Sequence, residues 1–347
     1  MRIGILTGGG DCPGLNAVIR AIVRRAKKSY NYEIIGILEG WLGLLNEKYV
    51  KLDREKVAGI VYRGGTVIKT SRTNPLNIDG GLEKIINNMD SAGINALIAV
   101  GGEDTLGVAK ELHAKGVKVV GVPKTIDNDI YGTDYTFGFD TAVNIAMEAI
   151  DRVHTTAESH NRVMVVEVMG RHSGWIAIES GLAGGADVIL IPEKPFDVNS
   201  VCEIIKKRHG EGKDFSIVVV AEGAKFKVKA DEDGTFILQD TKKDAFGHVR
   251  LGGIGNVLAK EIEKRTGFES RVVILGYIQR GGSPTAFDRV LSTRFGVGAV
   301  ELIEKGDFGK MVALKGNNII SIPLEEALSK IKTVPEKFYK VAEVFFG

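Results

Sequence analysis

Short apolar runs alternate with helical patterns from one end of the chain to the other. Most of these runs are continuously apolar and rich in β-branched residues, as is typical of parallel strands that are covered on both faces. They lie at 3–7, 33–38, 96–100, 117–122, 162–168, 188–191, 217–221 and 272–277. Helical periodicity fills the intervals between them, as at 15–28, 106–115, 141–155 and 198–209. This order predicts a doubly wound α/β fold with largely parallel sheets.

The length of 347 residues is enough for two domains, each with its own core. We expect two Rossmann-like lobes, with the chain crossing between them more than once. One stretch, 225–248, alternates polar and apolar residues around Asp233 and Gly234. That pattern predicts a β-hairpin.

Composition adds one unusual feature, which is the glycine content. The apolar fraction of 44%, the charged fraction of 26% and the net charge of +2 are ordinary, so nothing suggests binding to nucleic acid or a membrane. The 44 glycines are roughly double the average usage, as expected where several βα loops approach phosphates. Cys12 and Cys202 show no metal-ligand spacing and are too few for a disulfide framework.

The beginning of the chain predicts a cytoplasmic protein. Met1 leads directly into the first apolar run, with no signal-peptide pattern. No apolar stretch approaches the length that a membrane-spanning helix needs.

Three of the predicted strands end in loops suited to phosphate chemistry. The first loop carries glycine at positions 8, 9 and 10, where exposed N–H groups and a helix amino terminus favour an anion. It does not match Walker A, which needs Gly-Lys-Ser/Thr at its end, and it is not a good G-x-G-x-x-G, because Pro13 sits where the dinucleotide turn would tighten. Packing alone is the alternative explanation for its glycines. At the carboxyl ends of adjacent parallel strands, such loops converge on one crevice.

The second and third loops add carboxylates to this crevice. Glu103 and Asp104 follow Gly101 and Gly102, and they either bind Mg²⁺ or complement a helix dipole. Asp127 and Asp129 follow Lys124 and Thr125 in the segment 124–129. One residue apart, the two aspartates lie on the same side of an extended segment, where one can accept the proton of an attacking hydroxyl. A cluster of Asx-turns is the alternative for them.

Arginines near the ends of the later strands suggest a site for a phosphomonoester. Arg162, Arg171, Arg271 and Arg280 could grip one together, because guanidinium groups fit phosphate oxygens in bidentate fashion. Any one of them alone is better explained as a surface arginine, and it is the presence of four at strand ends that favours a site.

These motifs resemble those of the phosphofructokinase family, from residue 3 to about residue 294. The chain contains Gly-Gly-Asp-x-Pro-Gly-x-Asn at 9–16, a Gly-Gly-acid loop at 101–105, Thr-Ile-Asp-Asn-Asp at 125–129, Met-Gly-Arg at 169–171, Ala-Glu-Gly at 221–223 and Gln-Arg-Gly-Gly-x-Pro at 279–284. Together, in the family's order, they are highly specific. The resemblance implies a larger donor-binding domain of 1–138 plus 279–330. It implies a smaller domain of 139–278 plus 331–347 that binds fructose 6-phosphate.

The resemblance also implies roles for individual residues. Asp127 would deprotonate the 1-hydroxyl of fructose 6-phosphate beside Thr125 and Lys124, and Glu103 would bind Mg²⁺. The substrate-binding residues would be Thr125, Asp127, Asp129, Arg162, Met169, Gly170, Arg171, Glu222, Arg271, Tyr277 and Arg280. The phosphoryl donor would lie against Gly10, Arg72, Gly102, Asp104, Thr105 and Lys124. Arg162 would reach in from a neighbouring subunit, which implies a homodimer or homotetramer.

Two departures from the ATP-using members predict that the donor is pyrophosphate. Asp104 stands where those members have a glycine, and Lys124 stands where they usually have another. A carboxylate ~4 Å from a nucleotide α-phosphate would repel it by roughly 4 kcal/mol at an effective dielectric of 20. That energy corresponds to a discrimination of about a thousandfold. Pyrophosphate ends where the α-phosphate would begin, and so it escapes this repulsion.

Three other functions remain open at this point. An ATP-dependent phosphofructokinase requires Asp104 to turn away and cap its helix. A dinucleotide-binding oxidoreductase is disfavoured by Pro13 and by the lack of a clean G-x-G-x-x-G. A non-catalytic regulatory paralogue has no chemical need for Asp127, Asp129 and Arg171 together.

The resemblance also bears on regulation. Tyr277 stands where bacterial members often carry a histidine. The family's effector pocket is only partly kept, since Arg25, Arg54 and Lys213 match basic positions there but Ala21, His154 and Glu211 do not. We therefore expect weak or absent control by ADP and phosphoenolpyruvate.

Overall fold

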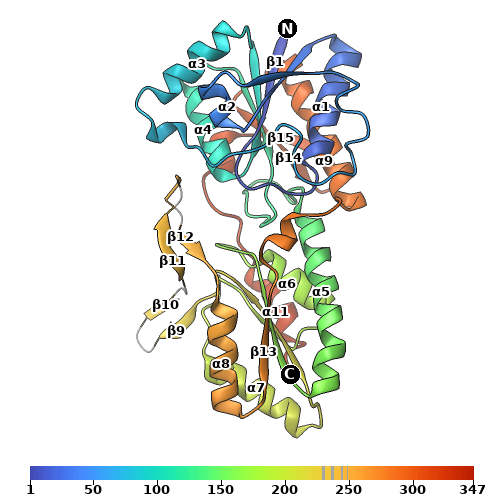
Figure 1. The fold of residues 1–347 in the computed structure, drawn as a ribbon, viewed down its shortest axis with the longest axis vertical. Coiled ribbons are helices and arrows are strands. Elements are labelled where there is room, and N and C mark those ends of the chain that lie inside the picture. Colours follow the sequence, from blue (N-terminus) through green and yellow to red (C-terminus); the bar gives the residue numbers. More distant parts are fainter. Residues whose placement is uncertain (229–230, 236–237, 244, 248) are drawn as a thin grey trace. The chain divides into compact units, whose positions relative to one another are not determined.

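The computed structural model describes residues 1–228, 231–235, 238–243, 245–247 and 249–347 (Figure 1). The chain divides into two units. Unit 1 comprises Met1–Thr141, Arg280–Ile331 and the described part of 244–248, and unit 2 comprises the remaining residues.

Unit 1 is built on a seven-stranded sheet in the order β15-β14-β5-β4-β1-β2-β3. Its strands are β1 (Arg2–Thr7), β2 (Glu33–Ile37), β3 (Tyr49–Leu52), β4 (Ala96–Gly101), β5 (Val119–Pro123), β14 (Lys310–Lys315) and β15 (Asn318–Pro323). The inner strands pair in parallel, whereas β3 and β15 run antiparallel at the two edges. Since β1, β4 and β5 are successive neighbours, the loops at their carboxyl ends lie side by side.

Helices cover this sheet. They are α1 (Leu15–Tyr30), α2 (Trp41–Leu45), α3 (Gly81–Ser91), α4 (Glu103–Ala114), α9 (Ala286–Glu304) and α10 (Leu324–Ala327), with the short 3-10 turn η1 (Pro75–Asn77). Helix α1 shows why the sequence forms them. It buries an apolar stripe that includes Val18 and Ile22, and its last turn carries Lys27 and Lys28, which complement the helix dipole. The helix ends at Tyr30, and its C-cap residue Asn31 adopts the left-handed conformation that asparagine tolerates.

Unit 2 contains a four-stranded parallel sheet in the order β13-β6-β8-β7. Its strands are β6 (Val163–Val168), β7 (Val188–Leu190), β8 (Ser216–Ala221) and β13 (Ser270–Ile274). The helices are α5 (Phe139–His160, which begins in unit 1), α6 (Trp175–Ala183), α7 (Val198–Gly210), α8 (Ile254–Thr266) and α11 (Glu336–Glu343), with the 3-10 turn η2 (Gly276–Arg280). Every residue of β6 and β8 is buried, as expected of parallel strands that are covered on both faces.

The predicted strands are all present, and the α/β architecture with largely parallel sheets is confirmed. Strand β14 and the two edge strands, β3 and β15, were not predicted. The hairpin prediction was wrong in its turn, because Asp233 and Gly234 lie within β10 (Asp231–Thr235). That strand pairs with β9 (Phe226–Val228), and β11 (Leu238–Lys243) pairs with β12 (Val249–Leu251). An Asp-Gly pair is only a local turn preference, and strand pairing overrides it.

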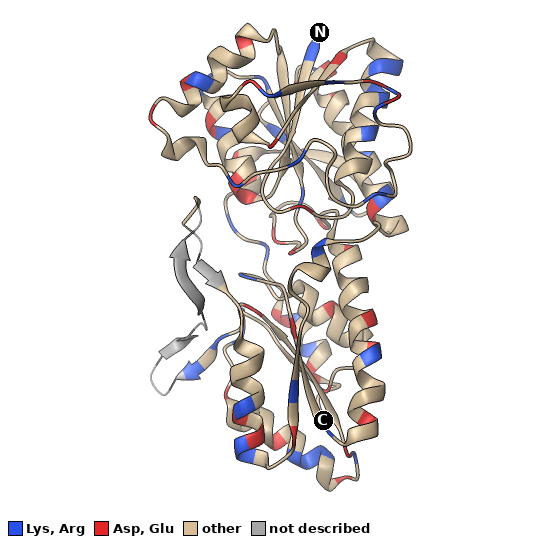
Figure 2. Cartoon of the chain, in the orientation of Figure 1, with Lys and Arg blue, Asp and Glu red and all other residues tan. Residues whose placement is uncertain are grey.

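The charges of the chain are mixed in sign. In the view of Figure 2, lysine and arginine alternate with aspartate and glutamate along the helices of each unit. None of the helices in the described part of the chain has the length and apolar content needed to cross a bilayer.

Candidate active site

The loops after β1 and β4 meet around the side chain of Thr105, which is 2% exposed. A Cβ added at Gly8 would lie 2.4 Å from Thr105 Oγ1, and one added at Gly101 would lie 2.3 Å from Thr105 Cβ. Real Cβ atoms do not approach other atoms so closely. These two glycines are therefore required for the packing of Thr105 between the loops.

The first loop does not offer all its N–H groups to a ligand, contrary to the sequence prediction. Gly8 N–H donates to Val100 O (3.0 Å), and Gly9 N–H donates to Ser71 O (3.1 Å). The Thr70 hydroxyl donates in turn to Gly9 O (2.7 Å). These bonds tie residues 70–71 to the first loop, and the exposed Arg72 follows directly.

Two cations lie beside Gly10. The ammonium of Lys124, a residue that is 4% exposed, donates to Gly10 O at 2.5 Å, and burial lowers the pKa of this lysine. A Cβ at Gly10 would lie 2.5 Å from a terminal nitrogen of Arg280, which also donates to Asp11 O (3.5 Å). The family resemblance implies that Arg280 binds the sugar phosphate, whereas in the structure Arg280 belongs to unit 1, with the predicted donor-binding residues.

Helix α4 begins at Glu103, and its amino terminus follows the glycines of the second loop. Gly102 is the N-cap residue and, as a glycine, has no side chain with which to cap the helix. The first turn carries Glu103, which is exposed, and Asp104, which is half-buried. First-turn N–H groups lack an intrahelical acceptor, and so this end of α4 is suited to phosphate oxygens.

The third loop, Thr125–Asp129, follows β5 and alternates in burial. Ile126 and Asn128 are buried, whereas Thr125, Asp127 and Asp129 are half-buried. The segment is not the extended strand assumed from the sequence, because it contains a turn and Asn128 has a positive φ of 50°.

The carboxylates of this loop are close enough to influence one another. Burial first, and then the negative charge of Asp127, raises the pKa of Asp129 to about 7, with a smaller effect from Glu103. A hydrogen bond from Thr125 acts in the opposite direction. Among the residues that the structure describes, no group of three or more histidine, cysteine, aspartate or glutamate side chains is arranged to hold a metal ion by itself.

In unit 2, two loops at the carboxyl ends of β6 and β8 are joined through their backbones. Glu222 N–H donates to Val168 O (2.8 Å), and Gly223 N–H donates to Gly170 O (3.0 Å). A Cβ at Gly223 would lie 2.0 Å from Arg171 O, so only glycine fits there. The predicted substrate residues Met169, Gly170, Arg171 and Glu222 therefore lie together.

Two supporting residues of these loops were not recognised from the sequence. Glu167, which is 3% exposed, accepts hydrogen bonds from the N–H groups of Gly253 (3.0 Å) and Gly255 (2.8 Å) at the start of α8. Gln279 is fully buried and accepts a hydrogen bond from Met169 N–H (3.3 Å). The glycine pattern at 252–255 was the available signal for the first of them.

The predicted cluster of four arginines does not form within one chain. Arg162 precedes β6 and Arg271 pairs with Met164 near the start of β6, whereas Arg171 follows its end. The six residues of β6 separate the two ends by roughly 20 Å. Arg162 forms an ion pair with Glu269 at 2.8 Å. Tyr277 lies in η2 and is 79% exposed.

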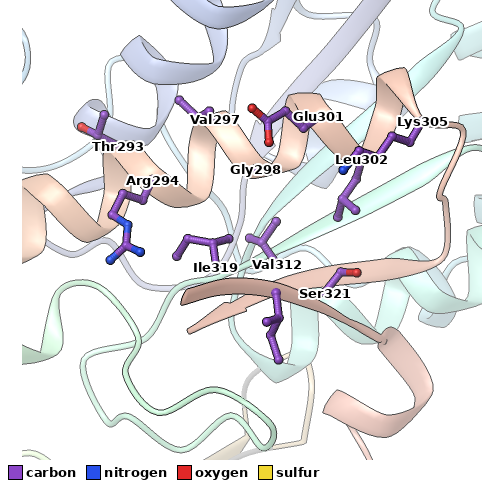
Figure 3. Close-up of a pocket in the computed structure, with 11 residues that line it drawn as sticks. Thr293, Arg294, Val297, Gly298, Glu301, Leu302, Lys305, Val312, Ile319 and Ser321 are labelled. Atoms are coloured by element: carbon purple, nitrogen blue, oxygen red, sulfur yellow. The ribbon is translucent and has the colours of Figure 1, made fainter. Parts of the chain in front are cut away.

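A groove elsewhere in unit 1 lies between α9 and the strands β14 and β15 (Figure 3). Its walls are largely apolar, with Val297 and Leu302 on α9 and Val312 and Ile319 on the strands. No predicted site residue is among the described residues that line it, so the groove does not bear on the site prediction.

Comparison with known proteins agrees with these motifs. Residues 2–303 match the model of the family described as Phosphofructokinase. The chain is 59% identical over 347 residues to the pyrophosphate–fructose 6-phosphate 1-phosphotransferase of Amycolatopsis methanolica, covering 100% of both chains. It is 52% identical over 343 residues to ATP-dependent 6-phosphofructokinase 3 of Streptomyces coelicolor, covering 99% of each.

The fold also matches solved structures. The T-state phosphofructokinase of Pichia pastoris superposes with a TM-score of 0.84 at 30% identity, over 99% of this chain and 36% of the yeast chain. This chain thus spans about a third of that larger protein. By its sequence and by its α/β fold with mostly parallel sheets, the chain belongs to the phosphofructokinase family.

Proposed function

We propose that this protein transfers a phosphoryl group reversibly from pyrophosphate to O1 of fructose 6-phosphate, giving fructose 1,6-bisphosphate and orthophosphate. The observation that carries this proposal is the presence of two residues together: Asp104 in the first turn of α4, and a buried Lys124 beside Gly10. Relatives named for pyrophosphate are 58% to 59% identical, against 51% to 53% for relatives named for ATP.

Unit 1 supplies the donor site in this proposal. The first turn of α4 would bind pyrophosphate oxygens through its N–H groups, aided by Gly102, Thr105 and the exposed Arg72. Lys124 and Arg280 place positive charge beside Gly10, where the transferred group would be stabilised. The half-buried Asp104 would repel the α-phosphate of a nucleotide.

Asp127 would act as the base. Its carboxylate accepts the proton of the 1-hydroxyl, the freed oxygen attacks phosphorus, and the bridging P–O bond of pyrophosphate breaks to release orthophosphate. Thr125 orients this residue, because its hydroxyl oxygen accepts a hydrogen bond from Asp127 N–H at 3.1 Å. Asp129 lies close enough to Asp127 for the charge of Asp127 to raise its pKa, in addition to the larger effect of burial. Asp129 would contact the same substrate.

The residues fit Mg²⁺ as the required metal. Burial first, and then the charges of Asp127 and Glu103, raise the pKa of Asp129, so a cation beside these carboxylates would stabilise their charged forms. Mg²⁺ typically uses one or two carboxylates and completes its shell with phosphate oxygens and water, which agrees with the lack of a larger ligand cluster among the described residues. Glu103 would hold the ion, and the ion would neutralise charge on the transferring phosphoryl group.

Unit 2 supplies the sugar-phosphate site. Met169, Gly170, Arg171 and Glu222 lie together at the carboxyl ends of β6 and β8, and Tyr277 would replace the hydrogen bond of the family's histidine. Arg162 and Arg271 lie at the opposite end of the sheet, and we assign both to the site of a neighbouring subunit. The active enzyme is then a homodimer or homotetramer.

The experiment is a direct comparison of donors. Fructose 1,6-bisphosphate formation is measured with Mg²⁺ and either pyrophosphate or ATP, for the wild type, Asp104→Gly and Asp104→Gly/Lys124→Gly. We expect activity with pyrophosphate in the wild type and a gain of ATP use in the variants, of up to about a thousandfold. Glu111→Gly in the same helix is the control for helix destabilisation, and its donor preference should not change. A wild type that uses ATP alone would overturn the proposal.

A further inference from the structure

The loop that carries Asp127 and Asp129 contains one residue with an uncommon backbone conformation. Asn128, between the two aspartates, has a φ of 50° and is 1% exposed. Asparagine is among the few residues that enter the left-handed region without a large steric penalty. Its side chain therefore points into the protein, while the two carboxylates beside it remain half-buried.

A second buried residue, Thr136, holds Asn128 and the start of the loop. Asn128 Oδ1 accepts a hydrogen bond from Thr136 N–H (3.0 Å) and lies 3.5 Å from the Thr136 hydroxyl. That hydroxyl donates to Thr125 O at 2.7 Å, and the Asn128 amide nitrogen donates to Asp134 O at 3.5 Å. Thr136 has no exposed surface.

The segment that carries Thr136 is itself fixed to the sheet. Asp134 N–H donates to Leu314 O (2.9 Å) in β14, and Leu314 N–H donates to the Thr133 hydroxyl (3.0 Å). At the two ends of the loop, Lys124 and Ile130 form isolated β-bridges with Phe137 and Ile331. A continuous path of hydrogen bonds thus connects β14 to the backbone that presents the aspartates.

We propose that Asn128 and Thr136 are positioning residues, which set the direction of the Asp127 and Asp129 carboxylates through the backbone of the loop. This inference rests on the proposed role of Asp127 as the base. Without the Thr136 hydroxyl, Thr125 O loses its donor, and Thr125 is the residue whose side chain bonds Asp127 N–H and Asp129. A base misplaced by about 1 Å costs on the order of 100-fold in rate.

The test measures kcat and both KM values with pyrophosphate for Thr136→Val, Thr136→Ser and Asn128→Gly. Valine matches the shape of threonine without its hydroxyl, and glycine keeps the left-handed backbone but lacks the Asn128 contacts. We expect kcat to fall about 10- to 100-fold in Thr136→Val and Asn128→Gly, with each KM within about threefold of the wild type. Thr136→Ser should keep kcat within about threefold, because it retains the hydroxyl.

Two further measurements separate positioning from stability. Thr293→Val, which removes a hydroxyl that donates to Arg289 O (2.8 Å) in α9, is the matched control and should leave kcat unchanged. In an Asp127→Asn background, measured at raised enzyme concentration, Thr136→Val should cause little further loss, because the base it positions is already absent.

The outcomes distinguish this inference from the proposed function. A wild type inactive with pyrophosphate would contradict the function itself. An active wild type would overturn the inference if Thr136→Val kept kcat within about twofold, if Thr136→Ser were as impaired as Thr136→Val, or if the full loss persisted in the Asp127→Asn background.

Discussion

Thr105 packs against two glycines, Gly8 and Gly101. We predict that replacing either glycine with alanine destabilises the protein, and that only one of the two effects depends on the Thr105 side chain beyond Cβ. Gly8→Ala would place a Cβ 2.4 Å from Thr105 Oγ1, 2.8 Å from Cγ2 and 3.2 Å from Cβ. Gly101→Ala would place one 2.3 Å from Thr105 Cβ itself. Overpacking of this kind typically costs about 1–3 kcal/mol in the free energy of unfolding. For domains of 150–250 residues, that lowers the thermal midpoint by roughly 2–12 °C.

The two substitutions should differ when Thr105→Ala is combined with each. Alanine at position 105 lacks Oγ1 and Cγ2 but keeps Cβ. It therefore removes the close contacts of Gly8→Ala, leaving a separation of 3.2 Å, but it leaves the 2.3 Å overlap of Gly101→Ala. In the Thr105→Ala background, we expect Gly8→Ala to lower the thermal midpoint only slightly. Gly101→Ala should lower the thermal midpoint by as much in this background as it does in the wild type.

The assay is the thermal midpoint by circular dichroism or calorimetry for the three single and two double variants. Gly107→Ala is the control, because a Cβ there meets nothing within 4 Å and the residue lies inside α4. It should raise stability by about 0.5–1 kcal/mol, as expected for replacing glycine within a helix. The reasoning would be refuted if Thr105→Ala relieved both substitutions equally, or if Gly8→Ala alone cost nothing.

Three further predictions concern the base, a buried carboxyl and regulation. Asp127→Asn should lower kcat by orders of magnitude with little change in KM, and near-normal turnover would rule out Asp127 as the base. Asp288 is fully buried, and burial raises its pKa from 3.8 to about 6. The folded state thus binds this proton more tightly than the unfolded state does. The resulting contribution to the free energy of unfolding is on the order of 3 kcal/mol, is fully present below pH 3.8 and is lost as the pH rises through 6. Asp288→Asn cannot ionise, so the thermal midpoint of the wild type should fall relative to that of the variant between pH 4 and pH 7; a constant difference would contradict the assignment. Arg25, at an effector-pocket position, forms an ion pair with Glu301 at 3.0 Å. We therefore expect initial rates to remain hyperbolic when ADP or phosphoenolpyruvate is titrated. A sigmoidal response to either compound would count against the prediction.

The predicted strands and helices were found because their signals are local. The apolar runs of β4 and β5 are buried throughout, as continuous runs predict, and helix α7 begins and ends within one residue of the predicted range. The antiparallel edge strands β3 and β15 are only partly buried, so their sequences carry a weaker apolar pattern. Edge strands take their conformation from a partner strand, which periodicity does not report.

For the site, the sequence by itself determined the chemical groups and their order along the chain. The glycines, the carboxylates of the second and third loops and the Asp104–Lys124 pair are all readable as motifs. Tertiary structure alone decided which of these groups are near one another. It placed Arg280 beside Gly10, separated Arg162 and Arg271 from Arg171 by the length of β6, and used Gly8 and Gly101 to pack Thr105. Motifs record which residues a loop contains, whereas contacts between residues far apart in the chain depend on strand order and packing, which no local pattern encodes.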